Sequence, residues 1–242
     1  MSGFDIDKYI PHLSIDCVIF GYKDRELKVL ISKLRYGKDL WGLPGGYVLK
    51  TEGIDKAAAR ILKERTQLDN IYLDQFHVFG GENRIVGSSY RPLIISGLRD
   101  FDDGRFDQAA IEWITSRFVC IGYYALVNIN KVHPRAGKFE ERLEWRSCRE
   151  LPAMTHDHNE IVNHALRALR QNLDEKLIGF NLLPNTFTMK EIRELYEAVY
   201  DRKFPMNNFQ KKILDLNVLE RLGKKFTGAQ NRAPYLYKFK NQ

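Results

Sequence analysis

Alternating and continuous apolar runs in the first half of the chain predict a β-rich domain. Residues 13–22 and 27–35 are rich in β-branched and aromatic side chains and flank the polar stretch KDRE, so we expect them to form a β-hairpin. Runs of the same kind recur further along the chain. The expected strands cover residues 13–22, 27–35, 72–80 and 118–129, with a short strand near 143–146.

Apolar residues at helical spacing predict two helices in the same domain. One covers residues 53–68, and its apolar stripe consists of Ile54, Ala57, Ala58, Ile61 and Leu62. The other begins at about Asp157. Residues 83–116 look like an irregular insertion that ends in a short helix over 109–116. This order of hairpins and helices fits an α/β sandwich.

The C-terminal part of the chain has the pattern of a winged helix-turn-helix domain. Thr188 and Glu191 form a capping-box pair at the start of a first helix, and Asn207 or Asn208 is the expected cap of a second. Two short strands, 218–222 and 235–240, follow and flank a basic, glycine-containing loop. The predicted organisation is a first domain over residues 1–173, a linker over 174–186 and the winged helix over 187–242.

Composition places the chain among globular proteins. Apolar residues make up 44% of it and charged residues 29%, and no apolar run approaches the roughly 18 residues of a membrane span. The N-terminus lacks the basic start and apolar core of a secretory signal, so we expect a cytoplasmic protein and no membrane partner. Cys17, Cys120 and Cys148 lack ligand-type spacing and are expected to be buried, reduced thiols.

The net charge of +7 is concentrated near the C-terminus. Residues 188–242 hold twelve basic and six acidic residues, and no acidic residue follows Glu220. A basic module on a nearly neutral domain indicates a polyanionic partner, of which nucleic acid is the commonest. A solubilising tail is the alternative, but the segment is also rich in Leu, Ile, Phe and Tyr and should fold.

One motif carries chemical information. The segment that begins at Gly46 and continues into the first predicted helix resembles a Nudix box, which is a Gly, a Glu and an Arg-Glu-rich helix at fixed spacing. The stretch WGLPGG matches the usual approach to such a box. The matching positions are Gly46, Glu52, Arg60, Leu62, Glu64 and Leu68. The resemblance implies a Nudix-like α/β/α sandwich.

The same motif departs from the pattern where the chemistry would occur. In Nudix hydrolases, carboxylates on one face of this helix hold Mg²⁺ or Mn²⁺ against a diphosphate. Those positions are 61, 64 and 65 here, and they hold Ile61, Glu64 and Arg65. Gln67 also replaces the usual glycine. We therefore expect no catalytic residues, no metal site and no cofactor, and we expect Glu52, Arg60 and Glu64 to form ion pairs that hold the loop and helix together.

The whole chain is similar to the Nudix-related transcriptional regulators, in which a degenerate Nudix domain senses a small molecule and a winged helix binds DNA as a homodimer. The segments 155–170 and 178–214 carry this resemblance. It implies double-stranded operator DNA as a partner, and a sugar or an ADP-ribose-like nucleotide as the effector. The insertion at about 83–116 lies close to where a Nudix ligand binds and is not part of the resemblance.

The expected DNA-binding residues lie on the second helix of the winged helix and in its hairpin. The amides of this set suit adenine, and its basic residues suit guanine or phosphates. Phe209, Ile213 and Leu216 are expected to pack inside the module. The predicted DNA-binding set is Asn207, Asn208, Gln210, Lys211, Lys212, Lys224, Lys225 and Arg232.

The expected effector-binding residues are charged or aromatic side chains near the box. For Trp41 and Tyr47, packing in the core is the alternative role. His156 and His158 flank a helix start, where capping or surface roles are expected. The predicted effector-binding set is Lys33, Arg35, Trp41, Tyr47, Glu64, Glu82 and Arg84.

These features predict a DNA-binding regulator that senses a small molecule through a catalytically inactive Nudix-like domain. One alternative is an active Nudix pyrophosphatase acting on ADP-ribose or a sugar nucleotide, in which an acid such as Glu82 assists Glu64. Another is an interaction module whose basic hairpin binds RNA or protein. The effector, the operator and the direction of regulation are not fixed by the sequence.

Overall fold

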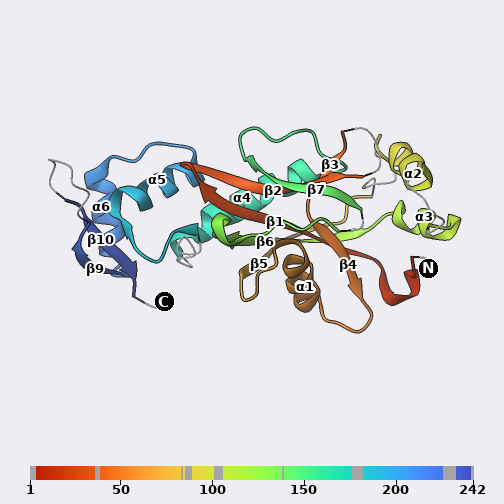
Figure 1. Ribbon diagram of the computed structural model, residues 1–242, viewed down its shortest axis with the longest axis horizontal. Coiled ribbons are helices and arrows are strands. Elements are labelled where there is room, and N and C mark those ends of the chain that lie inside the picture. Colours follow the sequence, from red (N-terminus) through yellow and green to blue (C-terminus); the bar gives the residue numbers. More distant parts are fainter. Residues whose placement is uncertain are drawn as a thin grey trace.

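The computed structural model describes residues 4–35, 39–82, 84, 89–100, 106–137, 139–175, 182–225 and 233–240. The molecule is elongated, with the sheet-based N-terminal domain and the C-terminal module at opposite ends (Figure 1). The helix α4 (His158–Glu175) runs from the first domain towards the second. No described helix is both long enough and apolar enough to cross a bilayer.

Within the described residues, seven strands form one mixed sheet. Its central pair is parallel, with Leu13–Gly21 aligned beside Val119–Val127, and the other pairs are antiparallel. The order is β3-β2-β1-β6-β5, with β4 also paired to β1 and β7 to β2. The strands are β1 (Tyr9–Lys23), β2 (Glu26–Leu34), β3 (Trp41–Gly42), β4 (Gly45–Leu49), β5 (Tyr72–Phe79), β6 (Val119–Val127) and β7 (Glu140–Ser147).

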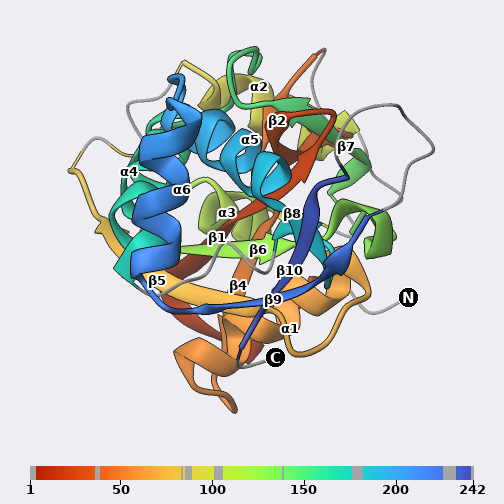
Figure 2. The ribbon, with the colours of Figure 1, turned by 90° about the vertical axis from the view of Figure 1, so that its left-hand side faces the viewer.

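The central strands bury both of their faces, because successive side chains of a strand point to opposite sides. Val18 and Phe20 of β1 lie in the apolar cluster that contains Ile161 and Leu169 of α4. Cys17 and Ile19 lie in a second cluster, with Ala57, Ala58, Ile61 and Leu62 of α1 (Ile54–Thr66). The prediction for Ile54, the fifth residue of the stripe, is wrong, because its side chain is 38% exposed at the start of the helix. Helices α1 and α4 thus cover opposite faces of the sheet, as Figure 2 shows. The predicted α/β/α sandwich is confirmed.

The local elements of this domain follow the sequence pattern closely. The predicted hairpin is present, and Asp24 and Arg25 of its turn have positive φ angles of 54° and 61°. The predicted strands and both helices are found with small shifts at their ends. The short strands β3 and β4 were not predicted, because their glycines and proline indicate a turn rather than a strand.

The prediction of an irregular insertion is wrong for residues 91–100. They form helix α2 (Arg91–Asp100), and the expected short helix follows as α3 (Gln108–Ile114). Ile94 and Leu98, one helical turn apart, pack with Leu40 and Ile111 in a small apolar cluster. Pro92 is tolerated because it lies in the first turn of the helix. Packing against the domain stabilises a helix whose Gly97 and β-branched residues lower its intrinsic propensity.

The C-terminal module has the predicted helix-turn-helix and hairpin. Helix α5 (Met189–Tyr200) begins with the predicted capping box of Thr188 and Glu191, which is confirmed. The predicted asparagine cap of α6 (Met206–Asp215) is wrong: Pro205 occupies the N-cap position, so Asn207 and Asn208 lie inside the first turn. The strands β9 (Leu219–Lys224) and β10 (Tyr235–Phe239) pair, and the short β8 (Phe187–Thr188), which was not predicted, joins β10.

The core of this module includes Phe209 and Ile213, as predicted. The prediction for Leu216 is wrong, because its side chain is 37% exposed at the end of α6. The module's buried residues form one cluster with those of α4 and the α4-facing side of the sheet. Helix α4 continues to Glu175, and the predicted linker over 174–186 falls partly outside the described residues, so the boundary at 173 stays a prediction.

The three cysteines are free. Cys17 and Cys120 are buried as predicted, and Cys148 is half-buried. Burial raises the pKa of the Cys17 thiol to about 12, so it stays protonated and acts as a small apolar side chain.

Replacing Leu169 of α4 by Ala should lower the free energy of unfolding by about 2–5 kcal/mol, because it leaves a cavity between the helix and the sheet. Chemical denaturation followed by circular dichroism measures this loss. The matched control is Leu93→Ala on α2, where the side chain is 49% exposed. We expect the control to stay within about 0.5 kcal/mol of the parent protein, and equal losses would contradict the proposed packing role of α4.

Candidate functional site

A cavity of about 400 Å³ lies at the end of the sheet near the N-terminus and the insertion. Its walls come from β4, α1, α2, the end of α3, the loop before β7 and the start of α4. Gly45 and Gly46 of β4 allow this close approach of elements. A Cβ atom on Gly45 would lie 2.5 Å from Asp16 Oδ1, and one on Gly46 would lie 3.0 Å from Ile61 Cδ1.

The acidic residues of the box are used to hold α1 against β4. Arg60 donates to both carboxylate oxygens of Glu52, at 3.0 and 2.6 Å, and to the carbonyl oxygen of Tyr47. Its third nitrogen donates to Glu64 at 3.2 Å. The side-chain hydrogen bond from Arg60 lowers the pKa of Glu52 below its ordinary value. The predicted ion pairs among Glu52, Arg60 and Glu64 are confirmed.

The other two box positions line the cavity with groups that cannot bind a cation. Ile61 is buried and packs on Gly46. Arg65 donates from Nε to Glu140 Oε1 at 3.1 Å and from Nη2 to the carbonyl oxygen of Gly45 at 3.2 Å. Glu140 also accepts from the backbone N–H of Gly137, so both of its oxygens are occupied.

A divalent metal ion does not fit this set of donors. Glu64 already pairs with Arg60, and the guanidinium of Arg65 lies on the same wall as a fixed positive charge. In the described parts of the chain, no three His, Cys, Asp or Glu side chains gather where they could hold a metal ion. A hard cation such as Mg²⁺ requires oxygen ligands, and here a hydrocarbon and a cation replace two of them.

A buried polar cluster centred on Asp16 forms another part of the wall. Arg84 of the insertion donates to Asp16 at 3.2 Å and to Asp157 at 2.7 Å, and Cys120 Sγ lies 2.9 Å from Asp16. Burial alone would raise the pKa of Asp16, but His158 and Arg84 hold it below its ordinary value. Asp16 is therefore ionised, and the positive charge of Arg84 compensates its negative charge.

His158 does not have the capping or surface role expected from the sequence. It is buried, and its Nδ1 accepts from the backbone N–H of Leu43 at 3.1 Å. The proton of the neutral ring therefore lies on Nε2, which is 3.6 Å from Asp16 Oδ2. The expectation was wrong because the chain folds α4 back onto the sheet at this point, which the local sequence does not indicate.

His156 also lines the cavity and is strained. Its φ angle is 56°, and within the described residues its buried Nδ1 has no hydrogen-bond partner. Burial, with further lowering by His158 and Arg84, brings the pKa of His156 to about 4. The ring is therefore neutral near pH 7. Positive φ and an unsatisfied buried nitrogen are features that concentrate at functional sites.

Aromatic rings form the opposite part of the cavity region. Tyr47 meets Trp113 edge-on with ring centroids 4.7 Å apart, and Trp113 meets Phe118 at 4.9 Å. Phe4 and Tyr9 from the N-terminal segment join this group and line the cavity. Phe4, Tyr9 and Phe118 were not predicted as site residues, because only the fold brings them together and the local sequence gives no signal for this.

Three of the predicted effector-binding residues line the cavity: Tyr47, Glu64 and Arg84. The other four lie elsewhere. Trp41 is packed in the core and faces Lys33, Arg142 and Arg146 at 5.4–5.6 Å, which agrees with the packing alternative. Lys33 pairs with Asp39, Arg35 donates to the carbonyl oxygen of Glu140, and Glu82 is exposed.

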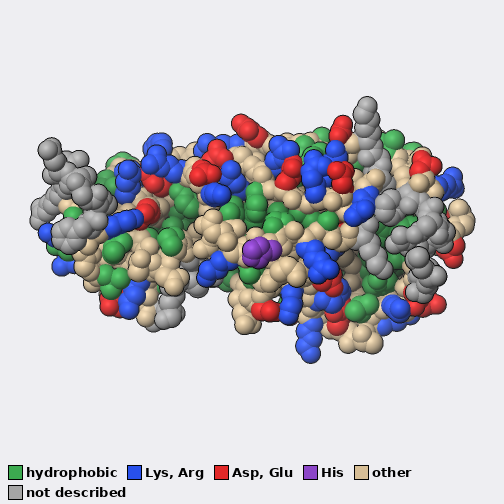
Figure 3. Space-filling model, in the orientation of Figure 1, with side chains coloured by type: hydrophobic (Ala, Val, Ile, Leu, Met, Phe, Trp, Pro, Cys, Tyr) green, Lys and Arg blue, Asp and Glu red, His purple; other side chains and the backbone are tan. Residues whose placement is uncertain are grey.

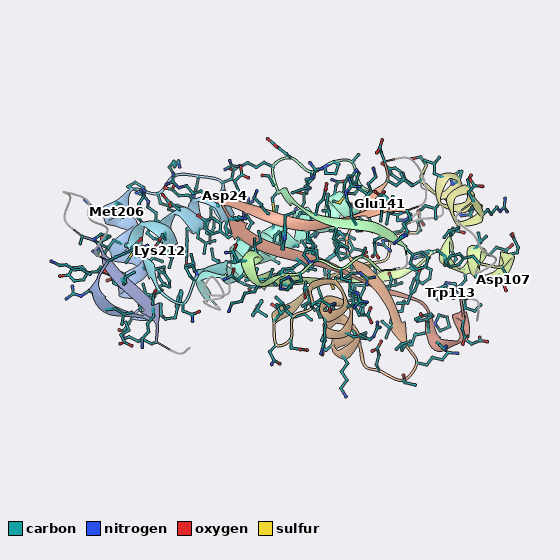
Figure 4. All side chains as sticks on the ribbon, in the orientation of Figure 1. Asp24, Asp107, Trp113, Glu141, Met206 and Lys212 are labelled. Atoms are coloured by element: carbon teal, nitrogen blue, oxygen red, sulfur yellow. The ribbon has the colours of Figure 1, made fainter. Side chains whose placement is uncertain are left out.

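The predicted DNA-binding residues lie at the other end of the molecule. Met206 and Lys212 of α6 lie far from Trp113 and Asp107, as Figure 4 shows. Asn207, Asn208, Gln210, Lys211 and Lys212 are all exposed on α6. Lys212 lies over the ring of Tyr196, Lys224 lies over Tyr235, and Lys225 pairs with Glu191 at 3.1 Å. Arg232 lies outside the described residues.

The basic side chains are not confined to this module at the surface. On the face shown in Figure 3, Lys and Arg side chains alternate with Asp and Glu along the whole length of the molecule. On this face the basic side chains do not form one continuous patch, and the features that set the C-terminal module apart are the exposed polar face of α6 and the excess of basic residues in the sequence.

Lowering the pH from 7 to 5 should reduce the free energy of unfolding of the wild-type protein by more than it reduces that of the His156→Asn variant. The pKa of His156 is lower in the folded state than in the unfolded chain, so its contribution is complete above about pH 6.5 and declines as the pH falls towards 4. The difference at pH 5 should reach about 2 kcal/mol. Asparagine tolerates the positive φ at this position. Urea unfolding at both pH values measures the effect, and identical losses would exclude a buried neutral histidine.

Comparisons with known proteins agree with this architecture. Residues 179–239 match the family model of the NrtR DNA-binding winged helix domain. The chain is 25% identical over 236 residues to the ADPR responsive transcriptional repressor NtrR of Acinetobacter baylyi, covering 95% of this chain and 82% of that protein.

Solved structures show the same fold. NrtR of Shewanella oneidensis is 23% identical with a TM-score of 0.68, and the match covers 95% of this chain and 94% of the other. A MutT/nudix family protein from Enterococcus faecalis is 18% identical with a TM-score of 0.66, covering 99% and 89%. The chain thus combines a Nudix-fold domain with a C-terminal NrtR-type winged helix domain, and over almost its whole length it is similar to the Nudix-related regulators of the NrtR type.

Proposed function

We propose that this protein is a DNA-binding transcriptional regulator that senses a small molecule through its Nudix-fold domain. The observation that carries the proposal is the NrtR-type winged helix over residues 179–239, joined to a domain whose cavity has a box without a metal-binding donor set. The Acinetobacter baylyi relative is described as an ADPR responsive repressor, so ADP-ribose is the first effector to test and repression the first direction.

DNA recognition is assigned to helix α6. Its exposed face carries amides that can pair with adenine edges and lysines that can reach guanine or phosphate, a combination suited to the major groove. Lys224, the last residue of β9, and Lys225 after it would neutralise phosphates beside the groove. A structure of the Shewanella oneidensis protein in complex with a 27mer DNA has the same fold as this chain, with 23% identity and a TM-score of 0.69.

The cavity suits a ligand with both a ring and charged groups. Its volume of about 400 Å³ lies in the range of small-molecule sites. Phe4, Tyr9 and Tyr47 offer aromatic surfaces, while Arg65 and Arg91 offer cationic ones. A nucleotide of the ADP-ribose type has a base, two riboses and a diphosphate, and it would use both kinds of wall. A sugar would use fewer of these groups and is the second candidate.

Helix α4 and the β1–β2 hairpin provide a physical route from the cavity to the DNA-binding module. His158, the first residue of α4, lines the cavity, and near the other end Arg170 donates to the carbonyl oxygen of Val199 in α5 at 2.7 Å. Tyr200 returns a hydrogen bond to the carbonyl oxygen of Arg170 at 2.8 Å.

The β1–β2 hairpin and the segment after β7 each add an ion pair with the C-terminal module. Arg25 pairs with Glu194 at 3.4 Å and Arg149 pairs with Asp201. An effector that binds one arrangement of these elements more tightly than another would shift the position of α5 and α6.

We further propose that the domain binds its ligand without hydrolysing it, since the groups that would hold a metal are replaced by Ile61 and Arg65. The active pyrophosphatase remains the alternative function, because Nudix-fold enzymes share the fold and Glu64 is retained. Assembly as a homodimer and a cytoplasmic location stay predictions. An RNA- or protein-binding role for the basic hairpin would be indicated if no DNA fragment were bound.

Replacing Lys211 by Ala should weaken binding to operator DNA and reduce the slope of log K against log salt by about 1, because one phosphate contact is lost. Fluorescence anisotropy with labelled fragments from the protein's own promoter region, across about 50 to 200 mM KCl, measures both quantities. The control Lys63→Ala removes an exposed lysine of α1 in the other domain and should change neither. Equal affinity for promoter and random fragments would count against a specific regulator.

The wild-type protein should release no phosphate-containing product from ADP-ribose or nucleotide sugars in the presence of Mg²⁺. A coupled phosphatase assay detects such turnover. Turnover well above the blank that is lost in Glu64→Gln would favour the pyrophosphatase alternative, because that change removes the remaining box carboxylate of the cavity wall.

A further inference from the structure

Four of the described arginines line the cavity, and they differ in how many of their N–H donors already make hydrogen bonds. Arg60 is bound to Glu52, Glu64 and the carbonyl oxygen of Tyr47 through all three of its nitrogens. Arg84 is held between Asp16 and Asp157. Both therefore serve as internal braces, and both are neutralised by carboxylates.

Arg65 makes hydrogen bonds to described residues through only two of its three nitrogens. Its Nε and Nη2 donate to Glu140 and to the carbonyl oxygen of Gly45, while Nη1 is 3.7 Å from Glu64 Oε2 and makes no hydrogen bond with any described residue. Gly137 lies close to the guanidinium, since a Cβ there would be 2.8 Å from both Cζ and Nη1. The group is fixed in orientation and keeps N–H donors available at the cavity wall.

Arg91 is the arginine with the least compensation. It is the first residue of α2, which Ile94 and Leu98 anchor to the domain. Its Nε donates to the carbonyl oxygen of Thr115 at 3.1 Å. Among the described residues it has no ion pair, and its two terminal nitrogens make no hydrogen bond. Arg91 thus adds a net positive charge to a cavity whose other arginines are paired.

We propose that Arg65 and Arg91 bind the phosphates of the effector directly, so that recognition requires no divalent cation. The inference rests on the proposed function, because it assigns the anion-binding groups of the same cavity. A planar guanidinium group can donate hydrogen bonds to two phosphate oxygens at once. This interaction is strongest where the protein already holds the guanidinium in the required orientation. Arg65 is contributed by α1 and Arg91 by the insertion, so the insertion completes the anion site.

Phosphate binding without a metal ion follows from the residues that surround this anion site. A cation placed beside Glu64 would meet the guanidinium of Arg65, which Glu140 and Gly45 hold in place. The positive charge that a diphosphate needs is therefore supplied by the protein itself. We expect the effector's ring to bind on the side of Tyr47 and Phe118, where aromatic surfaces line the same cavity.

Isothermal titration calorimetry with the full chain and ADP-ribose tests the proposal. Binding should have the same affinity in EDTA and in Mg²⁺. Arg91→Gln should weaken ADP-ribose binding about 10- to 100-fold, as expected for lost charge-assisted hydrogen bonds, and should leave the affinity for adenosine unchanged. The matched control is Arg99→Gln, which removes an exposed arginine of the same helix that does not line the cavity and should bind ADP-ribose as the wild type does.

The outcomes separate this inference from the proposed function. ADP-ribose binding that requires Mg²⁺, or that is as tight in Arg91→Gln as in wild type, would overturn the inference and leave a ligand-sensing regulator intact. If ADP-ribose does not bind, inorganic pyrophosphate in EDTA serves as the probe. A rise in melting temperature that Arg91→Gln abolishes would support the anion site with another effector, and no rise would overturn it. Unchanged circular dichroism and operator binding show that the variant is folded.

Discussion

Burial of both faces of β1 and β6 is the constraint on which the rest of the structure depends. The parallel pair lies at the centre of the sheet, and its alternate side chains enter two separate apolar clusters. Each cluster requires a helix to close it, and this fixes the positions of α1 and α4. Because α1 carries the box and α4 begins at the cavity, the packing of two strands also determines which side chains can meet there.

Because both faces of β1 are buried, one charged side chain, Asp16, lies in the interior of the domain. It occupies a buried site on β1, where an unpaired carboxylate would be strongly unfavourable. Arg84, His158 and Cys120 surround it, and they come from the insertion, from α4 and from β6. The cluster ties three distant parts of the sequence to the floor of the cavity. The insertion, which was predicted to be irregular, therefore contributes Arg84 to this buried polar cluster.

The sequence predicts much of the fold because its strands and helices carry strong local patterns. The capping box at Thr188 and four of the five predicted stripe residues of α1 were found at the expected positions, since both depend on residues that are close in the chain, whereas Ile54 is 38% exposed. Helix α2 was missed because tertiary packing outweighs the weak propensity of a segment containing Gly97. The N-cap of α6 was misplaced by two or three residues, because Pro205 and not an asparagine occupies that position.

The site was harder to predict, because it is assembled from residues far apart in sequence. Box positions such as Glu64 and Arg65 could be placed by their spacing, whereas the partner of Arg65 is Glu140, seventy-five positions away. Trp41 likewise faces Arg142 and Arg146 from a distant part of the chain, and it lies outside the cavity. Long-range pairing of charges leaves little trace in a single sequence.

The length of α4 gives the molecule a mechanical advantage. Its 18 residues span about 27 Å at the usual rise per residue. One end contacts the cavity, and a hydrogen bond from Arg170 clamps the other part to α5. A rigid rod of this length that tilts by only about 5° displaces its far end by about 2 Å. A small tilt of α4 at the cavity would therefore move the residues that contact α5 by a distance comparable to a hydrogen-bond length.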